Sequence, residues 1–205
     1  MSIVTYNNRS IANISAIPGA AESLTHIKTL TASSSSTLSF VNGSSDVVLD
    51  STYPIYLFKF IGIHPGTSNA DLGILASTDT GSSYGVATTS TFFEAKHAED
   101  DSQAEIAYID SFDAQQSTSL IKLTGSIASD NDSNASGEMY LFNPSSTTFV
   151  KNFISTANRM FNSRSLNSFV SGYVNTTSAV DAIQFKMDSG NIDAGTIKLY
   201  GLKDS

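Results

Sequence analysis

The sequence predicts an all-β fold: an antiparallel β-sandwich of jelly-roll type that follows an extended N-terminal arm. About ten to twelve short runs alternate apolar and polar residues with a period of two, and turn-forming residues separate them. Ser and Thr make up about a quarter of the chain, and these residues favour strands and turns. No convincing helical period accompanies the strands, so a parallel βαβ architecture is disfavoured.

The composition excludes several classes of partner and site. The net charge is −8, and the 11 Lys and Arg residues are dispersed, so no positive patch is available for nucleic acid or an anionic membrane. The chain contains no cysteine, which rules out disulfides, thiolate metal sites and a cysteine nucleophile. No apolar run approaches the roughly 18 residues of a spanning helix, and the first residues do not resemble a signal peptide. We expect no nucleic-acid partner and no membrane insertion.

Residues 1–20 differ from the rest of the chain, because isolated isoleucines stand among Asn, Ser and Arg residues. The segment is too short and too polar to form a stable helix alone. We interpret it as an attachment arm that orders against a partner, and residues 21–205 as the sandwich domain. A frayed terminus, or a strand along its own domain, is the alternative. The candidate partner-binding residues are Tyr6, Arg9, Ile11 and Ile14. The isoleucines would serve as apolar anchors and the arginine would bind a carboxylate or carbonyl.

The alternating pattern begins at Ser23 and continues to the C-terminus. Before the closing pair, strands are expected within residues 23–33, 36–43, 46–54, 55–63, 70–77, 90–97, 104–112, 119–127, 138–144, 147–156 and 168–176. The run 55–63 is apolar on both faces, so we expect it to lie centrally between packed layers. Only residues 19–28 and 149–160 could form short helices instead.

The last two runs frame a turn. Ile183 and Phe185 share one face of the first run, and Ile197 and Leu199 share one face of the second. Residues 189–195 between them hold two glycines and an asparagine, which tolerate positive φ angles. The pattern predicts a half-buried antiparallel hairpin with one solvated face.

Residues 92–101 are the first candidate for chemistry. On a helix, the spacing of Glu94 and His97 would place them on one face, as in some metal sites. On the strand predicted here they would point to opposite faces. We interpret the stretch as a solvated acidic segment, with a metal or catalytic site as the alternative.

Residues 130–138 resemble a calcium loop but lack its glycine at the sixth position and its glutamate at the twelfth. An exposed turn is expected, with bound calcium as the alternative. The three histidines, His26, His64 and His97, form no local metal motif. Neither a G-x-S-x-G nucleophile motif nor a phosphate-binding loop occurs. We predict no catalytic residue, no metal, no cofactor and no enzymatic activity.

Several long stretches resemble small virion-associated structural proteins of tailed marine bacteriophages. Residues 31–40 and 50–65 are similar to a motif pair near the start of those proteins, and residues 136–155 and 172–202 are similar to their second half. The resemblance covers residues 23–202 and leaves the arm outside. It implies a structural protein of the virion, and the family has no catalytic residues to transfer.

We therefore expect a non-enzymatic bacteriophage structural protein at the virion surface or tail. The first expectation is a tail fibre or appendage component, anchored to other virion proteins by its arm and assembled as a homo-oligomer, with a trimer favoured. A capsid decoration protein is one alternative. Another is a carbohydrate-binding module at a fibre tip that recognises host surface glycans, with Tyr84 in the Gly- and Ser-rich loop 78–90 as the candidate contact.

Overall fold

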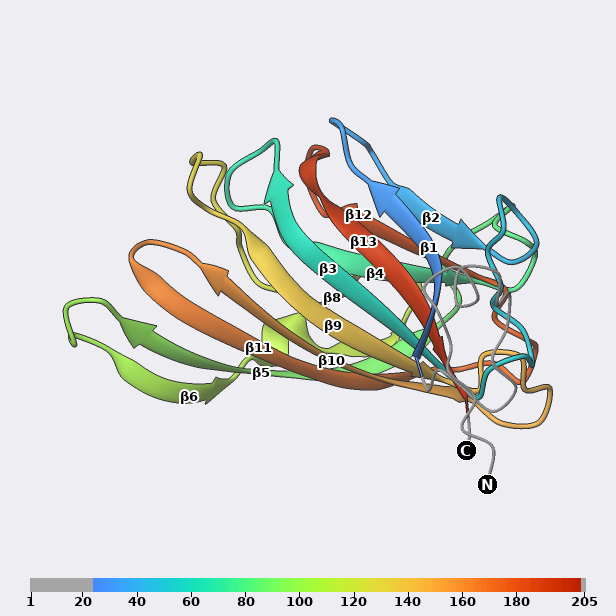
Figure 1. Ribbon diagram of the computed structural model, residues 1–205. Coiled ribbons are helices and arrows are strands. Elements are labelled where there is room, and N and C mark those ends of the chain that lie inside the picture. The colour runs from blue at the N-terminus through green and yellow to red at the C-terminus, as the bar shows by residue number, and fades with distance from the viewer. Residues whose placement is uncertain (1–23, 204–205) are drawn as a thin grey trace, which may run out of the picture.

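The computed structural model describes residues 24–203, which fold almost entirely into strands (Figure 1). The strands are β1 (Leu24–Thr31), β2 (Leu38–Val41), β3 (Ile55–Pro65), β4 (Leu72–Ser77), β5 (Thr88–Ala98), β6 (Ala104–Tyr108), β7 (Ala114–Ser117), β8 (Ile121–Lys122), β9 (Ala135–Phe142), β10 (Lys151–Met160), β11 (Arg164–Val174), β12 (Ala182–Met187) and β13 (Ile192–Leu202). A short 3₁₀ helix, η1 (Asp110–Phe112), follows β6. Within this described part, no helix has the length and hydropathy that crossing a bilayer requires.

The strands form two sheets with antiparallel pairing, packed face to face (Figure 1). The larger sheet has nine strands, in the order β1-β13-β3-β9-β10-β11-β5-β6, and β7 also pairs with β5. The smaller sheet has four strands, in the order β2-β12-β4-β8. We call the face of the large sheet that points toward the small sheet its inner face, and the opposite one its outer face.

Eight of the strands have the connectivity of a jelly roll. In chain order they are β1, β2, β3, β4, β8, β9, β12 and β13. In the large sheet, β1, β13, β3 and β9 are neighbours, which are the first, eighth, third and sixth of these strands. The small sheet consists of β2, β12, β4 and β8, which are the second, seventh, fourth and fifth. Two Greek keys wrapped into a double sheet produce this order. The predicted antiparallel sandwich of jelly-roll type is therefore confirmed.

Two insertions extend the large sheet beyond the jelly roll. One, from β5 to β7, lies between β4 and β8, and the other, β10 with β11, lies between β9 and β12. Both add their strands at the β9 side, because β10 pairs with β9, β11 with β10, and β5 with β11. The large sheet consequently projects past the small one (Figure 1).

The core lies between the two sheets and is rich in phenylalanine. Phe58 of β3, Phe40 of β2 and Phe185 of β12 are fully buried. The Phe185 ring centroid lies 5.3 Å from that of Phe58 and 6.2 Å from that of Phe40. Burying each such side chain stabilises the fold by about 1.5–3 kcal/mol. Alternation within each strand supplies these residues to one face, as the period-two pattern predicts.

The inner face of the inserted strands is covered by the segment between β6 and β9 rather than by the small sheet alone. Phe112 of η1 packs edge-on against Phe92 of β5, with 5.0 Å between the ring centroids. Leu123 and Ile127, which follow β8, are also fully buried. This segment thus continues the second layer over the extension.

The predicted C-terminal hairpin is wrong. β12 lies in the small sheet between β2 and β4, whereas β13 lies in the large sheet between β1 and β3. The segment that joins them crosses from one sheet to the other, as the jelly-roll connectivity requires. Alternation reports which face of a strand is buried, and it does not report which strand lies beside it.

The helical alternative is excluded in the described part of two regions, and one predicted strand is absent. Residues 151–160 form strand β10, and residues 24–28 belong to β1, so neither region is helical where the structure describes it. No strand forms within residues 46–54. The neighbours of β10 and β1 in the sheet decide their conformation, because tertiary packing overrides weak local propensity.

The central position of β3 within its sheet is confirmed, but the packed layer predicted on both sides is not. Phe58 and Phe60 on its inner face meet the small sheet, whereas within residues 24–203 no second layer of strands covers its outer face. Leu57 on that outer face is buried, and Tyr140 and Tyr200 lie opposite it on the adjacent strands.

Candidate functional site

The outer face of the inserted strands carries a row of large apolar side chains, exposed except for the half-buried Phe169, which we call the outer band. Its members are Ile106 and Tyr108 of β6, Phe93 of β5, Phe169 of β11 and Ile154 of β10. Tyr108 lies opposite Phe93, and Phe93 lies opposite Phe169. The exposed fractions are 75% for Ile106, 60% for Tyr108 and 51% for Ile154. Contiguous exposed apolar surface of this kind marks binding sites more often than single exposed residues do.

Consecutive apolar residues in the sequence produce the outer band. Phe93 follows the buried Phe92, and Ile154 follows the buried Phe153. Since neighbouring residues of a strand point to opposite faces, the first of each pair fills the core and the second reaches the outer surface. These doublets were the signal that the sequence offered for the site. The outer band is not expected from the sequence, because core packing is the usual role of aromatic residues.

The phenyl rings of Phe93 and Phe169 are stacked, with centroids 4.8 Å apart and planes inclined by 10°. A groove of about 300 Å³ runs beside them, lined by both rings together with Ile154 and Ser171. A hydrogen bond of 3.2 Å joins the hydroxyl groups of Thr91 and Ser171 near this groove. The walls of the groove are therefore apolar, and the hydroxyl groups of Thr91 and Ser171 lie next to them.

A second hollow, of about 530 Å³, continues the outer face toward β9 and β3. Asn158, Asn167 and Ile61 line it, and the ion pair of Lys59 and Glu138 lies at its border, with 3.7 Å between Nζ and Oε2. Aromatic rings and neutral amide or hydroxyl groups are the groups that bind uncharged sugars or the apolar side chains of a protein. The outer band thus has the chemistry of a binding surface.

The sequence-predicted arm residues Tyr6, Arg9, Ile11 and Ile14 lie outside the described residues. Tyr84, the candidate glycan contact, is half-buried. It packs over Gly81, where an added Cβ would approach the Tyr84 hydroxyl at 2.8 Å and Val41 of β2 at 3.1 Å. Tyr84 therefore stands beside the small sheet, and the structure does not bring it together with the outer band.

Asp79 organises the loop that carries Tyr84. Its carboxylate accepts hydrogen bonds from the Ser77 hydroxyl at 2.7 Å and from the Ser83 amide at 2.9 Å. The hydrogen bonds from these two serines lower the pKa of Asp79 to about 2. The loop is thus a tightly turned structure built around an ionised carboxylate.

The Glu94 and His97 pair behaves as the strand prediction requires. Glu94 points inward and is buried, whereas His97 is exposed on the outer face, 3.3 Å from the Asp101 carboxylate. The expectation of a solvated segment fails for Glu94, because its partner Arg159 lies in the interior.

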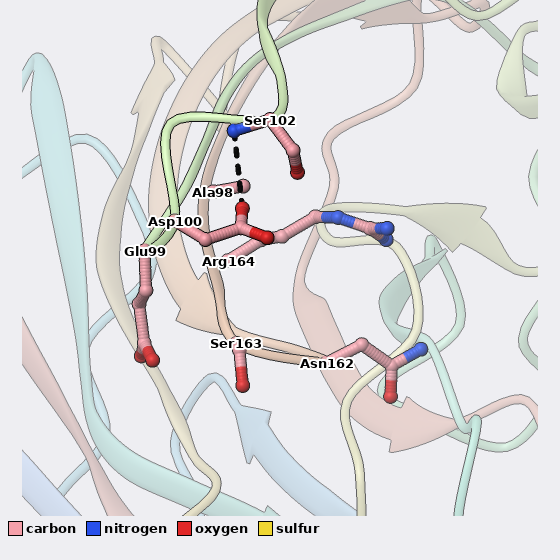
Figure 2. A pocket seen from close by; sticks show the side chains of 7 residues that line it. All are labelled: Ala98, Glu99, Asp100, Ser102, Asn162, Ser163 and Arg164. Carbon is pink, nitrogen blue, oxygen red and sulfur yellow. Dashed lines mark hydrogen bonds between the residues drawn. The ribbon is translucent and has the colours of Figure 1, made fainter.

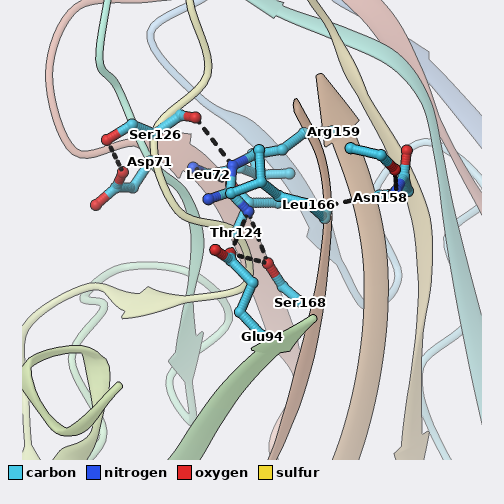
Figure 3. Close-up of polar contacts among 10 residues, drawn as sticks. Asp71, Leu72, Glu94, Thr124, Ser126, Asn158, Arg159, Leu166 and Ser168 are labelled. Atoms are coloured by element: carbon cyan, nitrogen blue, oxygen red, sulfur yellow. Dashed lines mark hydrogen bonds and ion pairs between the residues drawn. The ribbon is translucent and has the colours of Figure 1, made fainter. Parts of the chain in front are cut away.

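Figure 3 shows the buried network around Arg159, a second group that the sequence did not reveal. Arg159 Nη1 donates to Glu94 Oε2 at 2.6 Å and to the Ser168 hydroxyl at 2.9 Å, while Nε donates to the Ser126 carbonyl at 2.9 Å. These bonds join β10, β5 and β11 to the segment that covers them. Because each contact is internal, we assign the network a structural role.

Asp71 lies next to this network and is 3% exposed. It forms an ion pair with Lys122 and accepts a hydrogen bond from the Ser126 hydroxyl at 3.3 Å. Burial raises the pKa of the Asp71 carboxyl, and the ion pair with Lys122 opposes that rise. Lys122 also lies over the Phe112 ring, with Nζ 4.1 Å from the centroid.

A polar notch of about 370 Å³ lies between the tips of the β5–β6 and β10–β11 hairpins (Figure 2). Glu99, Asp100 and Arg164 line it, and the Glu99 amide donates to the Ser163 carbonyl at 3.0 Å, which ties the two tips together. Hydrogen bonds from Ser102 lower the pKa of Asp100. The notch mixes both signs of charge and presents no single ligand preference.

Residues 130–134 form a turn before β9. The Ser133 amide donates to the Asp130 carbonyl at 2.9 Å, and the Ser133 carbonyl lies 2.7 Å from His64 Nδ1. Glu138 pairs with Lys59 on the outer face. Across residues 24–203, no group of three His, Asp or Glu side chains is close enough together to hold a metal ion.

Comparison of the chain with models of known protein families, with curated proteins and with solved structures finds no significant match.

Proposed function

We propose that this chain is a non-enzymatic structural protein of a bacteriophage virion, a tail fibre or appendage component whose arm docks on the particle while the jelly roll projects from it. Jelly rolls occur in viral capsid and lectin domains, which supports the proposal by analogy of fold alone. The resemblance expected from the sequence for residues 23–202 points the same way, although the comparisons found no matching family or protein.

The observation that carries the proposal is the position of the two ends of the domain. Leu24 at the start of β1 pairs with Leu202 at the end of β13, so the chain enters and leaves the jelly roll at one corner of the large sheet (Figure 1). The outer band lies toward the opposite edge, on β10, β11, β5 and β6. Attachment at the first corner would leave the outer band free to meet another molecule.

The test is incorporation into particles. Phage particles are produced in cells that supply either the full chain or a chain lacking residues 1–20, and the protein is quantified in the purified particles. The full chain should be found in them, and the truncated chain should be lost although it folds, as circular dichroism would check. Equal incorporation of both chains contradicts anchoring by the arm, and absence of the full chain contradicts the virion assignment. Hundreds of copies per particle would indicate capsid decoration rather than an appendage.

A second candidate function is glycan binding, and the outer band favours it. The exposed aromatic rings offer stacking surfaces and the neighbouring Asn, Ser and Thr side chains offer uncharged hydrogen-bonding groups. A glycan array probed with the full chain and with Phe169→Ala and Tyr84→Ala tests both candidate positions. Binding through the outer band should weaken about 2- to 10-fold in Phe169→Ala, which removes one stacking ring, and persist in Tyr84→Ala. The reverse result assigns binding to the loop of Tyr84, and equal signals on every glycan reject this function.

A further inference from the structure

β6 is the outermost strand of the large sheet, and its free edge has neither the bulge nor the lysine of the opposite edge. At the opposite edge, β1 has a register shift between His26 and Lys28, and both a bulge and a lysine hinder further pairing. The edge strands of the small sheet, β2 and β8, have only four and two residues. β7, which pairs with β5 beside β6, has four residues and a register shift. β6 has five residues in regular register with β5, and it contains neither Lys nor Pro. Its one charged side chain, Glu105, is neutralised by an ion pair with Lys96 of β5. It is therefore the edge most open to another strand.

The hydrogen bonds at both ends of β6 show which backbone groups face β5. The Ala98 amide donates to the Gln103 carbonyl at 2.8 Å, and the Ile109 amide donates to the Phe92 carbonyl at 3.0 Å. Hydrogen-bonded pairs alternate along an antiparallel ladder. The residues of β6 with odd numbers therefore direct their N–H and C=O groups toward β5.

Ala104, Ile106 and Tyr108 consequently direct their backbone N–H and C=O groups away from the sheet. Two of the same residues, Ile106 and Tyr108, carry the most exposed large side chains of the outer band, at 75% and 60%. An unpaired backbone edge and an exposed apolar surface thus coincide on one strand. Both would be satisfied by a single partner strand laid along β6.

We propose that two copies of this chain pair edge to edge through β6, antiparallel and related by a two-fold axis at Ile106. Ile106 is the middle residue of the strand, so this axis pairs the whole of β6. Ala104 then lies opposite Tyr108 of the second copy, which places a small side chain beside a large one. Glu105 lies opposite Ala107 of the second copy, so no two acidic side chains face each other within the strand.

Charge selects this register over a neighbouring one. An axis at Glu105 would place two carboxylates directly opposite each other, which destabilises a strand pair. With the axis at Ile106, Asp110 beyond the strand end falls opposite Ser102 of the second copy. The interface is self-complementary, as a two-fold contact must be, and it joins the outer bands of both copies into one surface. This pairing does not depend on the virion assignment.

The first test is the oligomeric state of the purified full chain and of Ile106→Pro, measured by sedimentation equilibrium. The Ile106 N–H points away from β5, so proline removes an outward donor and leaves the β5–β6 ladder intact. The full chain should be a dimer, and Ile106→Pro should raise its dissociation constant at least about tenfold. Ile106→Lys provides a second disruptive variant if the proline prevents folding. Ile154→Lys, on the same face but inside the sheet, should remain dimeric.

The second test determines the register of the β6–β6 pair by disulfide cross-linking. Because the native chain has no cysteine, each introduced cysteine can form a disulfide only with another introduced cysteine. Under oxidation, Ile106→Cys should form a disulfide-linked dimer, because the Cα atoms of a hydrogen-bonded antiparallel pair lie about 5.5 Å apart. Ala104→Cys and Tyr108→Cys should each fail to link with themselves, since four residues separate the like positions by about 13 Å. A mixture of these two variants should link.

The proposal is overturned if the folded full chain is monomeric at about 100 μM, or if it is a trimer, as the sequence favoured. It is also overturned if Ile106→Cys does not cross-link while Ile154→Cys does. That second pattern would show that copies meet through the face of the sheet instead of its edge.

Discussion

Arg159 and Glu94 meet inside the extension of the large sheet although 65 positions separate them in the chain. Both side chains are almost completely buried, at 5% and 8% exposed. Removing one member of such a pair leaves an unpaired charge in the interior. We expect Glu94→Ala to lower the free energy of unfolding by about 3–5 kcal/mol, measured by urea denaturation.

The double variant Glu94→Leu with Arg159→Met separates the cost of leaving one charge unpaired from the net contribution of the ion pair to stability. Replacing both charges with apolar groups of similar volume is often neutral or stabilising. The double variant should therefore be clearly more stable than Glu94→Ala. A loss below about 1 kcal/mol in Glu94→Ala would mean that water reaches the guanidinium, and the network would then not be a buried one.

Asp71 gives the fold a pH dependence of known sign. Burial raises the pKa of this carboxyl above its usual 3.8. The folded chain then holds a proton at pH values where the unfolded chain has lost it, so the contribution of Asp71 to stability is complete below 3.8 and declines as the pH rises through the folded-state pKa. Asp71→Asn cannot lose a proton. Its stability relative to the native chain should therefore rise with pH across this window and then level off, as urea denaturation at a series of pH values would show.

A difference between the two proteins that stays constant with pH would mean that the ion pair with Lys122 offsets the effect of burial on the pKa of Asp71. A difference that falls with pH would mean that the ion pair outweighs burial. Ser126→Ala is the matched control, because it removes a hydrogen bond to the same carboxylate without removing the titrating group. The control should keep a pH dependence of the same sign as the native chain, displaced toward higher pH, because the Ser126 hydrogen bond lowers the pKa of Asp71.

At the scale of elements, β10 has a buried and an exposed side chain in adjacent positions. The contributions of the inner and outer faces of the sheet to stability can therefore be measured separately. Phe153 is 1% exposed and faces the core, whereas Ile154 is 51% exposed on the outer band. Phe153→Ala should cost about 3–5 kcal/mol of stability, whereas Ile154→Ala should cost less than about 1 kcal/mol in the monomer. Thermal or urea unfolding compares them. Equal losses would show that something covers the outer band in solution.

Most strands could be predicted from the sequence because period-two burial is a local property. β3, β5, β9 and β12 all lie within or across predicted runs. The pairing of strands could not be predicted in this way, because it depends on contacts between distant segments. The false C-terminal hairpin shows the limit: Ile183 and Ile197 are buried as expected, yet their strands lie in different sheets. The doublets Phe92–Phe93 and Phe153–Ile154 could have predicted part of the outer band, because consecutive strand residues point to opposite faces. No sequence pattern could have predicted that Arg159 is the partner of Glu94.

At the scale of the whole molecule, the first and last strands are neighbours. β13 lies between β1 and β3 in the large sheet, so the jelly roll is completed only by the final segment of the chain. Contacts between such distant segments make a sheet protein fold slowly, on the order of milliseconds to seconds. The two ends of the chain should therefore contribute differently to stability. The C-terminal strand β13 belongs to the domain, whereas the N-terminal arm is expected to lie outside it.

Two truncations test this inequality. Deleting residues 192–205 removes β13, strips both β1 and β3 of a neighbour, and takes the buried Ile197 and Leu199 from the core. This chain should lose its cooperative thermal transition, because the loss of a central strand exceeds the about 5–15 kcal/mol that stabilises a typical domain. Deleting residues 1–20 should instead shift the midpoint by only a few degrees, about the effect of 1 kcal/mol. A large loss of stability in the second truncation would place the arm within the folded domain, and the proposed anchor would then have to be sought elsewhere on the surface.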